Sequence, residues 1–407
     1  MTVEIGDKVK VVSSTVSSNY SNIVITTGLH PPWNHGEAVA MRNIVFTIKL
    51  VSRSEPIVYS SIDKSRFEGK YTEDVHYIEA NSISDYASLA LKSALGKISE
   101  TRSDTIFLHL SGVKEHIVYS LINKLYSKIS FPHKELYLII YDFGEISARW
   151  RTIPRPLHLY FDSAIGKLLT TSLSTYKCYG KFIRMNYLPV PYLLPENLNK
   201  TEDKECEVCI DRYDITNSIG YIGHLYENRF PYKLILKAVY KLVNSGFRDL
   251  VLVIVAPRTQ YNLEMGKLIK SYGRSLNLEK NLLIIIRNID ESCKHKLLKY
   301  FKIFLFVPIR QPVSMDPPMS IIEAMASKAL VVTTEYLSLK YFIKDGINGV
   351  IVEDLNADIL YKKIKNILNN NYLREQITQN AREYVLKKHC YRNVAKIFEE
   401  ILKRVRQ

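Results

Sequence analysis

The sequence predicts an α/β protein of two doubly wound domains, each with a parallel sheet covered by helices on both faces. The chain has 407 residues, whereas a single domain usually has about 100–200 residues. Short apolar segments alternate with amphipathic ones from end to end, which is typical of strands buried on both faces of a parallel sheet. A polar, acidic stretch interrupts this alternation near the middle, and the alternation then starts again.

The polar stretch sets the expected domain boundaries. It covers residues 196–217 and has almost no apolar runs, so we interpret it as a linker. The N-terminal domain is then expected at residues 1–195 and the second domain at 218–380. The last segment, 381–407, is expected to form a C-terminal helix that packs back on the N-terminal domain.

The individual elements follow from apolar runs of strand length and from apolar residues at helical spacing. In the first domain, strands are predicted at 22–29, 55–61, 74–80, 104–110 and 135–142, with further short strands between 167 and 192, and helices at 36–50, 84–98 and 113–129. In the second domain, strands are predicted at 218–223, 250–256, 282–286, 303–307, 329–333 and 349–352, and helices at 231–245, 293–300 and 319–327, with two more between 360 and 404.

The composition excludes several classes of protein. With 46% hydrophobic and 24% charged residues, the chain is not a disordered, collagen-like or low-complexity protein. Its net charge of +15 is spread along the sequence without a dense basic arm, so nucleic acid is not expected as a partner. The longest apolar runs are strand-sized, below the roughly 20 residues that span a bilayer. We expect a cytoplasmic protein that contacts an anionic membrane peripherally through basic side chains of the first domain, namely Lys114, Lys124, Lys128, Arg149 and Arg151.

The segment after the strand at 303–307 has the features of an anion site. Asp316 stands before two prolines where it can cap a helix, and the free amides of Met319, Ser320 and Ile321 would then face a ligand. Such a helix N-terminus suits a diphosphate. Glu323 shares the face of Met319 and Ser320, and its carboxylate could accept hydrogen bonds from two vicinal hydroxyls of a ribose. An exposed glutamate on an amphipathic helix is the alternative.

This part of the chain resembles the C-terminal domain of GT-B glycosyltransferases, specifically the retaining group that includes glycogen synthases and many mannosyl- and glucosyltransferases. That group has a glutamate-x7-glutamate motif whose second glutamate opens EAMA, as Glu323 does here. Residues 344–352, KDGINGVIV, resemble the DGxNG segment of the group. Gly223 and His224, with Arg229 beyond them, resemble its G-R-L…K-G element. Arg229 stands at the place of the donor-phosphate lysine, and His224 at that of an arginine.

The sequence departs from the group at the first motif glutamate, which falls on Met315. Asp316 is the adjacent acid, so it either replaces that glutamate at the donor sugar or only caps the helix. After EAMA, Ser327 and Lys328 stand where the group has a Cys-Gly or Ala-Gly pair.

The first domain resembles the group more loosely. Residues 30–37, HPPWNHGE, follow the first strand, where the group has a glycine-rich loop over the donor phosphates and the acceptor. Only Gly36 remains of the usual glycine pair. His109 ends a strand where the group often has an active-site histidine beside the reacting sugar. A buried core histidine is the alternative for His109.

The resemblance implies a GT-B protein with two Rossmann-like domains facing across a cleft. It implies that a hexosyl group moves, with retention, from a nucleotide-diphosphate sugar to a hydroxyl of a glycan, a lipid-linked acceptor or another acceptor. No cofactor is expected besides this co-substrate. No metal is expected, since the chain has no Asp-x-Asp pair and Cys206 and Cys209 have no second ligand pair. A catalytically weak nucleotide-sugar-binding protein, or a GT-B-like epimerase or phosphorylase, is the alternative.

Overall fold

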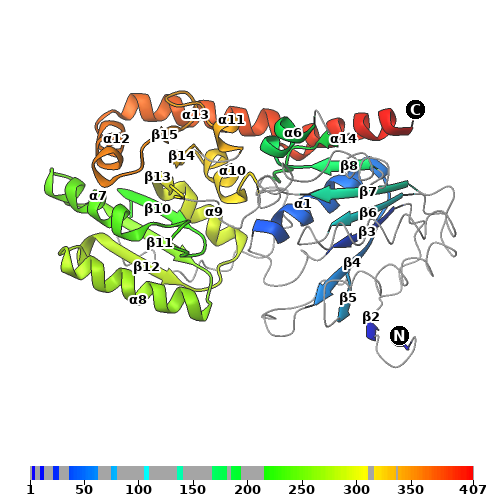
Figure 1. The fold of residues 1–407 in the computed structure, drawn as a ribbon, viewed down its shortest axis with the longest axis horizontal. Helices are drawn as coiled ribbons and strands as arrows, with labels where there is room; N and C mark the ends of the chain where they lie inside the picture. The colour runs from blue at the N-terminus through cyan, green and yellow to red at the C-terminus, as the bar shows by residue number, and fades with distance from the viewer. Residues whose placement is uncertain are drawn as a thin grey trace, which may run out of the picture. The chain divides into compact units, whose positions relative to one another are not determined.

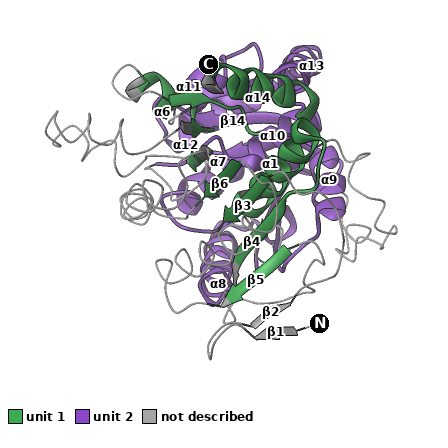
Figure 2. Cartoon of the chain, turned by 90° about the vertical axis from the view of Figure 1, so that its right-hand side faces the viewer, with its two compact units in different colours: residues 1–191, 391–407 green, residues 192–390 purple. Residues whose placement is uncertain are grey.

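The computed structural model divides the chain into two compact units, coloured separately in Figure 2. Unit 1 combines residues 1–191 with 391–407, and unit 2 is residues 192–390. The structure describes residues 2–4, 10–12, 22–26, 36–62, 75–79, 105–109, 135–140, 167–180, 185–193, 215–309, 316–335 and 338–406. The expected linker at 196–217 lies almost wholly outside these ranges.

Unit 2 contains a six-stranded parallel sheet in the order β12-β11-β10-β13-β14-β15 (Figure 1). Its strands are β10 Ser218–Ile222, β11 Val251–Ala256, β12 Leu282–Ile286, β13 Phe301–Phe306, β14 Leu330–Thr334 and β15 Val350–Val352. Chain order reverses between β10 and β13, and ligands of doubly wound sheets bind beyond the carboxyl ends of the strands at such a point. The apolar side chains of β11 and β14 are buried along their whole length.

The helices of unit 2 pack against this sheet and against one another (Figure 1). They are α7 Tyr232–Asn244, α8 Gln260–Ser275, α9 Glu291–Tyr300, α10 Met319–Ala326, the short α11 Leu339–Phe342, α12 Ala357–Asn369 and α13 Asn371–Lys388. Helix α8 is absent from the sequence-based prediction. It begins at Thr259, whose side chain accepts a hydrogen bond from the backbone N–H of Asn262. Its residues Gly266 and Gly273 have no space for a β-carbon, because side chains of β12 lie against them.

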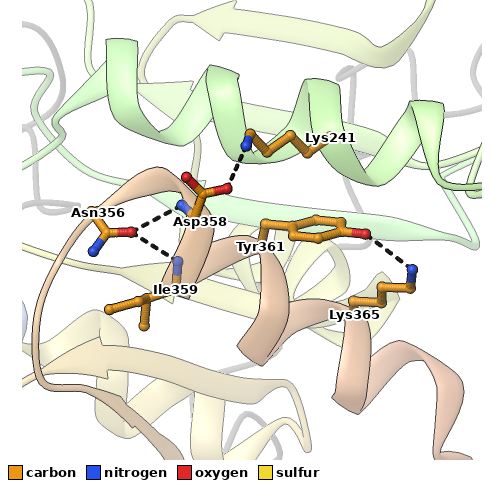
Figure 3. Close-up of polar contacts among 6 residues, drawn as sticks. All are labelled: Lys241, Asn356, Asp358, Ile359, Tyr361 and Lys365. Atoms are coloured by element: carbon orange, nitrogen blue, oxygen red, sulfur yellow. Dashed lines mark hydrogen bonds and ion pairs between the residues drawn. The ribbon is translucent and has the colours of Figure 1, made fainter.

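Helices α7 and α12 pack together and are joined by an ion pair drawn in Figure 3. Lys241 of α7 forms an ion pair with Asp358 in the first turn of α12, and this pairing lowers the pKa of the Asp358 carboxyl. Asn356 caps α12, since its side-chain oxygen accepts from the backbone N–H groups of Asp358 and Ile359 at 3.0 and 2.9 Å. The cap fixes where α12 starts, and the ion pair connects that first turn to α7.

The end of the chain differs from the prediction of two helices. Three are present, because Asn370 separates α12 from α13 and caps α13 through a hydrogen bond from the Leu373 N–H, 3.0 Å long. The third is α14, Tyr391–Arg406. The boundary expected after residue 380 therefore falls inside α13, and the units divide at Cys390 instead.

Unit 1 contains a seven-stranded parallel sheet in the order β5-β4-β3-β6-β7-β8-β9. Its strands are β3 Asn22–Thr26, β4 Ile57–Ile62, β5 Val75–Glu79, β6 Thr105–His109, β7 Glu135–Ile140, β8 Lys167–Thr170 and β9 Met185–Tyr187. A separate antiparallel pair joins β1 Thr2–Glu4 to β2 Lys10–Val12, and the described helices besides α14 are α1 Gly36–Ser52 and α6 Leu173–Tyr179. The helices predicted at 84–98 and 113–129 lie outside the described residues.

Helix α14 packs on α1 and so completes unit 1 (Figure 2). The ring of Tyr391 meets Phe46 of α1 edge-on, with centroids 5.5 Å apart. Phe398, which is buried, lies 5.5 Å from the ring of Phe107 in β6. Within the described part of the chain, no helix is long and apolar enough to cross a membrane.

Candidate functional site

The loops that follow β10 and β13 meet at the point where the chain order of the unit 2 sheet reverses. The backbone N–H of Ile309, just after β13, donates a hydrogen bond of 2.8 Å to the carbonyl oxygen of Asn228, in the loop after β10. Parallel strands point their carboxyl ends to one edge, so side chains from both loops gather there. Arg229, His224 and the segment before α10 all belong to this edge.

Arg229 packs closely against Phe306, Gly223 and Tyr221. Its guanidinium carbon is 5.3 Å from the centre of the Phe306 ring, at the end of β13. A β-carbon on Gly223 would lie 3.2 Å from a guanidinium nitrogen of Arg229, so glycine provides the space for this approach. Burial raises the pKa of the neighbouring Tyr221 phenol to about 12, although the positive charge of Arg229 opposes the shift. The buried Nε of Arg229 has no hydrogen-bond partner among the described residues.

His224 is held at this edge by a residue that the sequence did not indicate. Its Nδ1 lies 3.3 Å from the side-chain nitrogen of Asn262, which is fully buried near the start of α8. The same amide group accepts from the Leu225 N–H at 3.0 Å and donates to the Pro257 carbonyl at 2.8 Å. The imidazole stacks on Tyr226 with the ring planes 15° apart. The loops after β10 and β11 are thus tied together around His224.

The N-terminus of α10 offers backbone and side-chain donors. The N-cap position is occupied by Pro318, which provides no side-chain hydrogen bond. Ile321, expected to present a free amide, instead donates its N–H to the Pro318 carbonyl at 3.1 Å. The N–H groups of Met319 and Ser320 stand ahead of any intrahelical acceptor. The hydroxyl of Ser320 is buried and has no partner within the described ranges.

Asp316 does not cap α10, so the cap alternative is wrong. Its buried carboxylate accepts two hydrogen bonds from Ser338, one from the hydroxyl at 2.6 Å and one from the backbone N–H at 3.2 Å. Ser338 precedes α11, so Asp316 joins the segment before α10 to the loop after β14. The expected contact of Asp316 with a donor sugar stays a prediction.

Glu323 is buried, which excludes the alternative of an exposed glutamate. Its side chain is 2% exposed, and Oε1 accepts a hydrogen bond of 2.6 Å from Nζ of Lys294, on α9. The sequence did not single out Lys294. Helix α9 also contains Lys296 and Lys299, but helical spacing places only Lys294 on the face of Leu297 and Leu298, and this signal could have identified it.

In unit 1, His109 lies at the corresponding reversal of chain order, between β3 and β6. Its Nδ1 is 3.0 Å from the hydroxyl of Thr26, the residue that pairs with it across the two strands. Its Nε2 is 3.9 Å from Oε1 of Glu37, in the first turn of α1, which begins at Gly36. His109 is 2% exposed, as the core alternative predicts, yet a half-buried acid stands beside it.

Several residues named from the sequence lie outside the described residues. These are His30, His35, Lys114, Lys124, Lys128, Arg149, Arg151, Cys206, Cys209 and Met315. Among the residues that are described, no three His, Cys, Asp or Glu side chains gather closely enough to hold a metal ion.

Comparisons with known proteins agree with this description. The family model described as "Glycosyl transferases group 1" matches residues 212–384. An uncharacterized glycosyltransferase of Methanocaldococcus jannaschii is 21% identical over 300 residues, which cover 70% of this chain and 72% of that protein.

Two solved structures share the fold over almost the whole chain. A glycosyltransferase from Rickettsia africae superposes with a TM-score of 0.70 at 19% identity, covering 96% of this chain and all of that one. HepE from Anabaena, in complex with UDP and glucose, superposes with a TM-score of 0.67 at 11% identity. The match covers 95% of this chain and all of the HepE chain. Unit 2 thus carries the match to the group 1 glycosyltransferases, and the chain as a whole shares the GT-B fold of these solved structures.

Proposed function

We propose that this protein transfers a hexosyl group from a nucleoside-diphosphate sugar to an acceptor hydroxyl, without a metal ion and with retention of configuration. The observation that carries the proposal is the set of unused donors at the carboxyl edge of the unit 2 sheet. The buried Ser320 hydroxyl and the buried Nε of Arg229 have no partner among the described residues. Buried polar groups are rarely left unpaired in folded proteins, so an anionic ligand is the expected partner.

The chemistry of these donors suits a diphosphate leaving group. During transfer, the bond between the anomeric carbon and the diphosphate oxygen breaks, and a bond from that carbon to the acceptor oxygen forms. The acceptor proton leaves with the diphosphate or passes to solvent. Negative charge grows on the diphosphate, and Arg229, together with the N-terminal amides of α10, would stabilise that charge. This arrangement supplies the positive charge that a metal ion provides in other transferases.

The remaining roles follow the resemblance to the retaining group. Glu323 would accept hydrogen bonds from the ribose hydroxyls, and Asp316 would contact the donor sugar. His109 of unit 1 would orient the sugar or the acceptor. The structure of HepE holds UDP and glucose, and UDP-glucose is therefore the first donor to test.

The experiment measures release of nucleoside diphosphate from a panel of uridine, guanosine and adenosine diphosphate sugars, with water and with hydroxyl acceptors. We expect turnover of at least one donor, with no loss in excess EDTA. The Arg229→Ala variant should lose most of this turnover. Absence of both binding and turnover for every donor would overturn the proposal.

A binding protein without turnover is the second candidate. It is favoured by the engagement of Asp316, whose two carboxylate oxygens are both held by Ser338. If that carboxylate cannot turn to the sugar, no adjacent acid replaces the first glutamate of the motif. Tight binding of a nucleotide sugar without turnover of any donor, with acceptors supplied, would establish this candidate.

A further inference from the structure

The ion pair between Lys294 and Glu323 joins two helices inside unit 2. Lys294 lies on α9 and Glu323 on α10, and their side chains are 6% and 2% exposed. Nζ and Oε1 are 2.6 Å apart, a distance typical of a charge-assisted hydrogen bond. The pair is therefore shielded from solvent and well defined in geometry.

A buried ion pair is a poor way to gain stability. Removing two charges from water costs more than their attraction often returns, and well-packed apolar side chains commonly stabilise such a position better. Ile322 and Ala324, which flank Glu323 in sequence, and Leu298, one turn after Lys294, are buried as well. The charges at this position therefore call for a role other than holding α9 against α10.

The position of Glu323 indicates what that role is. Glu323 lies one turn after the unused donors at the start of α10. A carboxylate can accept about four hydrogen bonds, and Lys294 donates to its Oε1. The lysine thus sets the plane and the counter-charge of the carboxylate that the resemblance places at the ribose.

We propose that Lys294 is a positioning residue that orients the Glu323 carboxylate toward the ribose of a bound nucleotide. The inference rests on the proposed function, because it needs a nucleoside diphosphate at the α10 N-terminus. Lys294 does not contact the ligand. Its contribution is the ability of the site to distinguish a ribose from a 2′-deoxyribose.

The test compares the affinities of ribo- and 2′-deoxyribonucleoside diphosphates, uridine and guanosine forms, by calorimetry. A hydrogen bond from a hydroxyl to a charged acceptor corresponds to about a tenfold difference in affinity. Wild type is expected to prefer the ribose form by about this factor. The Lys294→Met variant, in which an apolar chain of similar length replaces lysine, should reduce the preference to less than threefold.

Two variants serve as controls. Glu323→Gln removes the acceptor charge directly and should also abolish the preference. Lys299→Met changes an exposed lysine on the same helix and should keep the wild-type preference. If Lys294 has only a structural role, Lys294→Met should have a lower melting temperature than wild type but the same preference for the ribose form.

The outcomes separate the inference from the function on which it rests. If folded Lys294→Met keeps the wild-type preference while Glu323→Gln loses it, Lys294 is not a positioning residue and the proposed function stands. If wild type binds no nucleoside diphosphate, the proposed function fails. Should Lys294→Met not fold, Lys294→Leu, which likewise has neither a donor nor a charge, takes its place, and a wild-type preference there would again overturn the inference.

Discussion

The backbone N–H of Ile309 donates to the carbonyl of Asn228, and this one bond connects the two loops at the reversal of the unit 2 sheet. It places Arg229, the residue after Asn228, against the end of β13, where its guanidinium lies over the Phe306 ring. Its side chain contacts Phe306 and Tyr221, and no carboxylate among the described residues is paired with it. Its charge remains available to an anion.

The first prediction concerns this cation. Arg229→Ala should weaken binding of a nucleoside diphosphate by about 1.5–3 kcal/mol, the usual range for a hydrogen bond to a charged group. Calorimetric titration with uridine and guanosine diphosphates measures it. Arg274→Ala, an exposed arginine in the last turn of α8, should bind as wild type. Unchanged affinity of Arg229→Ala for whichever diphosphate wild type binds would remove Arg229 from the site.

The second prediction concerns the contact between Asp316 and Ser338. Asp316→Ala leaves the buried hydroxyl and N–H of Ser338 without their acceptor, so it should lower the free energy of unfolding by about 1–3 kcal/mol. Ser338→Ala removes only the hydroxyl and should cost less. The two substitutions should couple by about 0.5–3 kcal/mol in a double-mutant cycle measured by urea unfolding. Strict additivity would show that the contact contributes nothing.

The third prediction concerns the end of α10, where Lys328 has a left-handed backbone with φ of 63°. The Lys328 N–H donates to the Met325 carbonyl and the Ala329 N–H to that of Ala324, a C-terminal motif in which glycine is usual. Lys328→Gly should therefore raise the free energy of unfolding by about 0.5–1 kcal/mol. Lys328→Ala keeps a β-carbon and should bring no gain. Equal stability of both variants would contradict this account.

The fourth prediction concerns alkaline pH. The pKa of Tyr221 is about 12 in the folded chain and about 10 when unfolded. Because the pKa is higher in the folded chain, ionisation of Tyr221 does not lower the free energy of unfolding below pH 10. That free energy falls as the pH rises from 10 to 12. Between pH 9 and 11, the free energy of unfolding of wild type should fall by about 1 kcal/mol more than that of Tyr221→Phe, whose side chain at this position cannot ionise. Parallel losses in the two proteins would show that Tyr221 does not contribute.

The strands of both sheets could be predicted from sequence because each is a short apolar run between polar turns. Helix α8 could not, since its buried face includes Gly266 and Gly273, which add no apolar signal and instead leave space for side chains of β12. The break between α12 and α13 depends on one capping side chain, Asn370. A helical pattern continues through such a break, so the pattern suggests one helix where there are two.

The candidate site was predictable where one local segment provides its residues, as with Ser320 and Glu323 on α10. Partners from distant segments were not predictable. Ser338 follows β14 and Lys294 lies on α9, and no local pattern connects either residue with its partner on another segment. Asp316 shows the same limit, because its place before two prolines suggests a helix cap, whereas its hydrogen bonds reach across to another loop. Local rules describe a residue's neighbours in the chain, and tertiary contacts decide its role.

The return of α14 to unit 1 has a consequence for synthesis on the ribosome. Residues 192–390 emerge before α14 and can complete their own sheet. Unit 1 emerges earlier, but the parts of α1 and β6 that α14 covers stay exposed until Phe398 has been synthesised. Domains usually fold in the order in which they are made, and here the first to emerge is the last to finish. A stop codon just before Tyr391 would therefore destabilise unit 1, which begins the chain, and leave unit 2 able to fold.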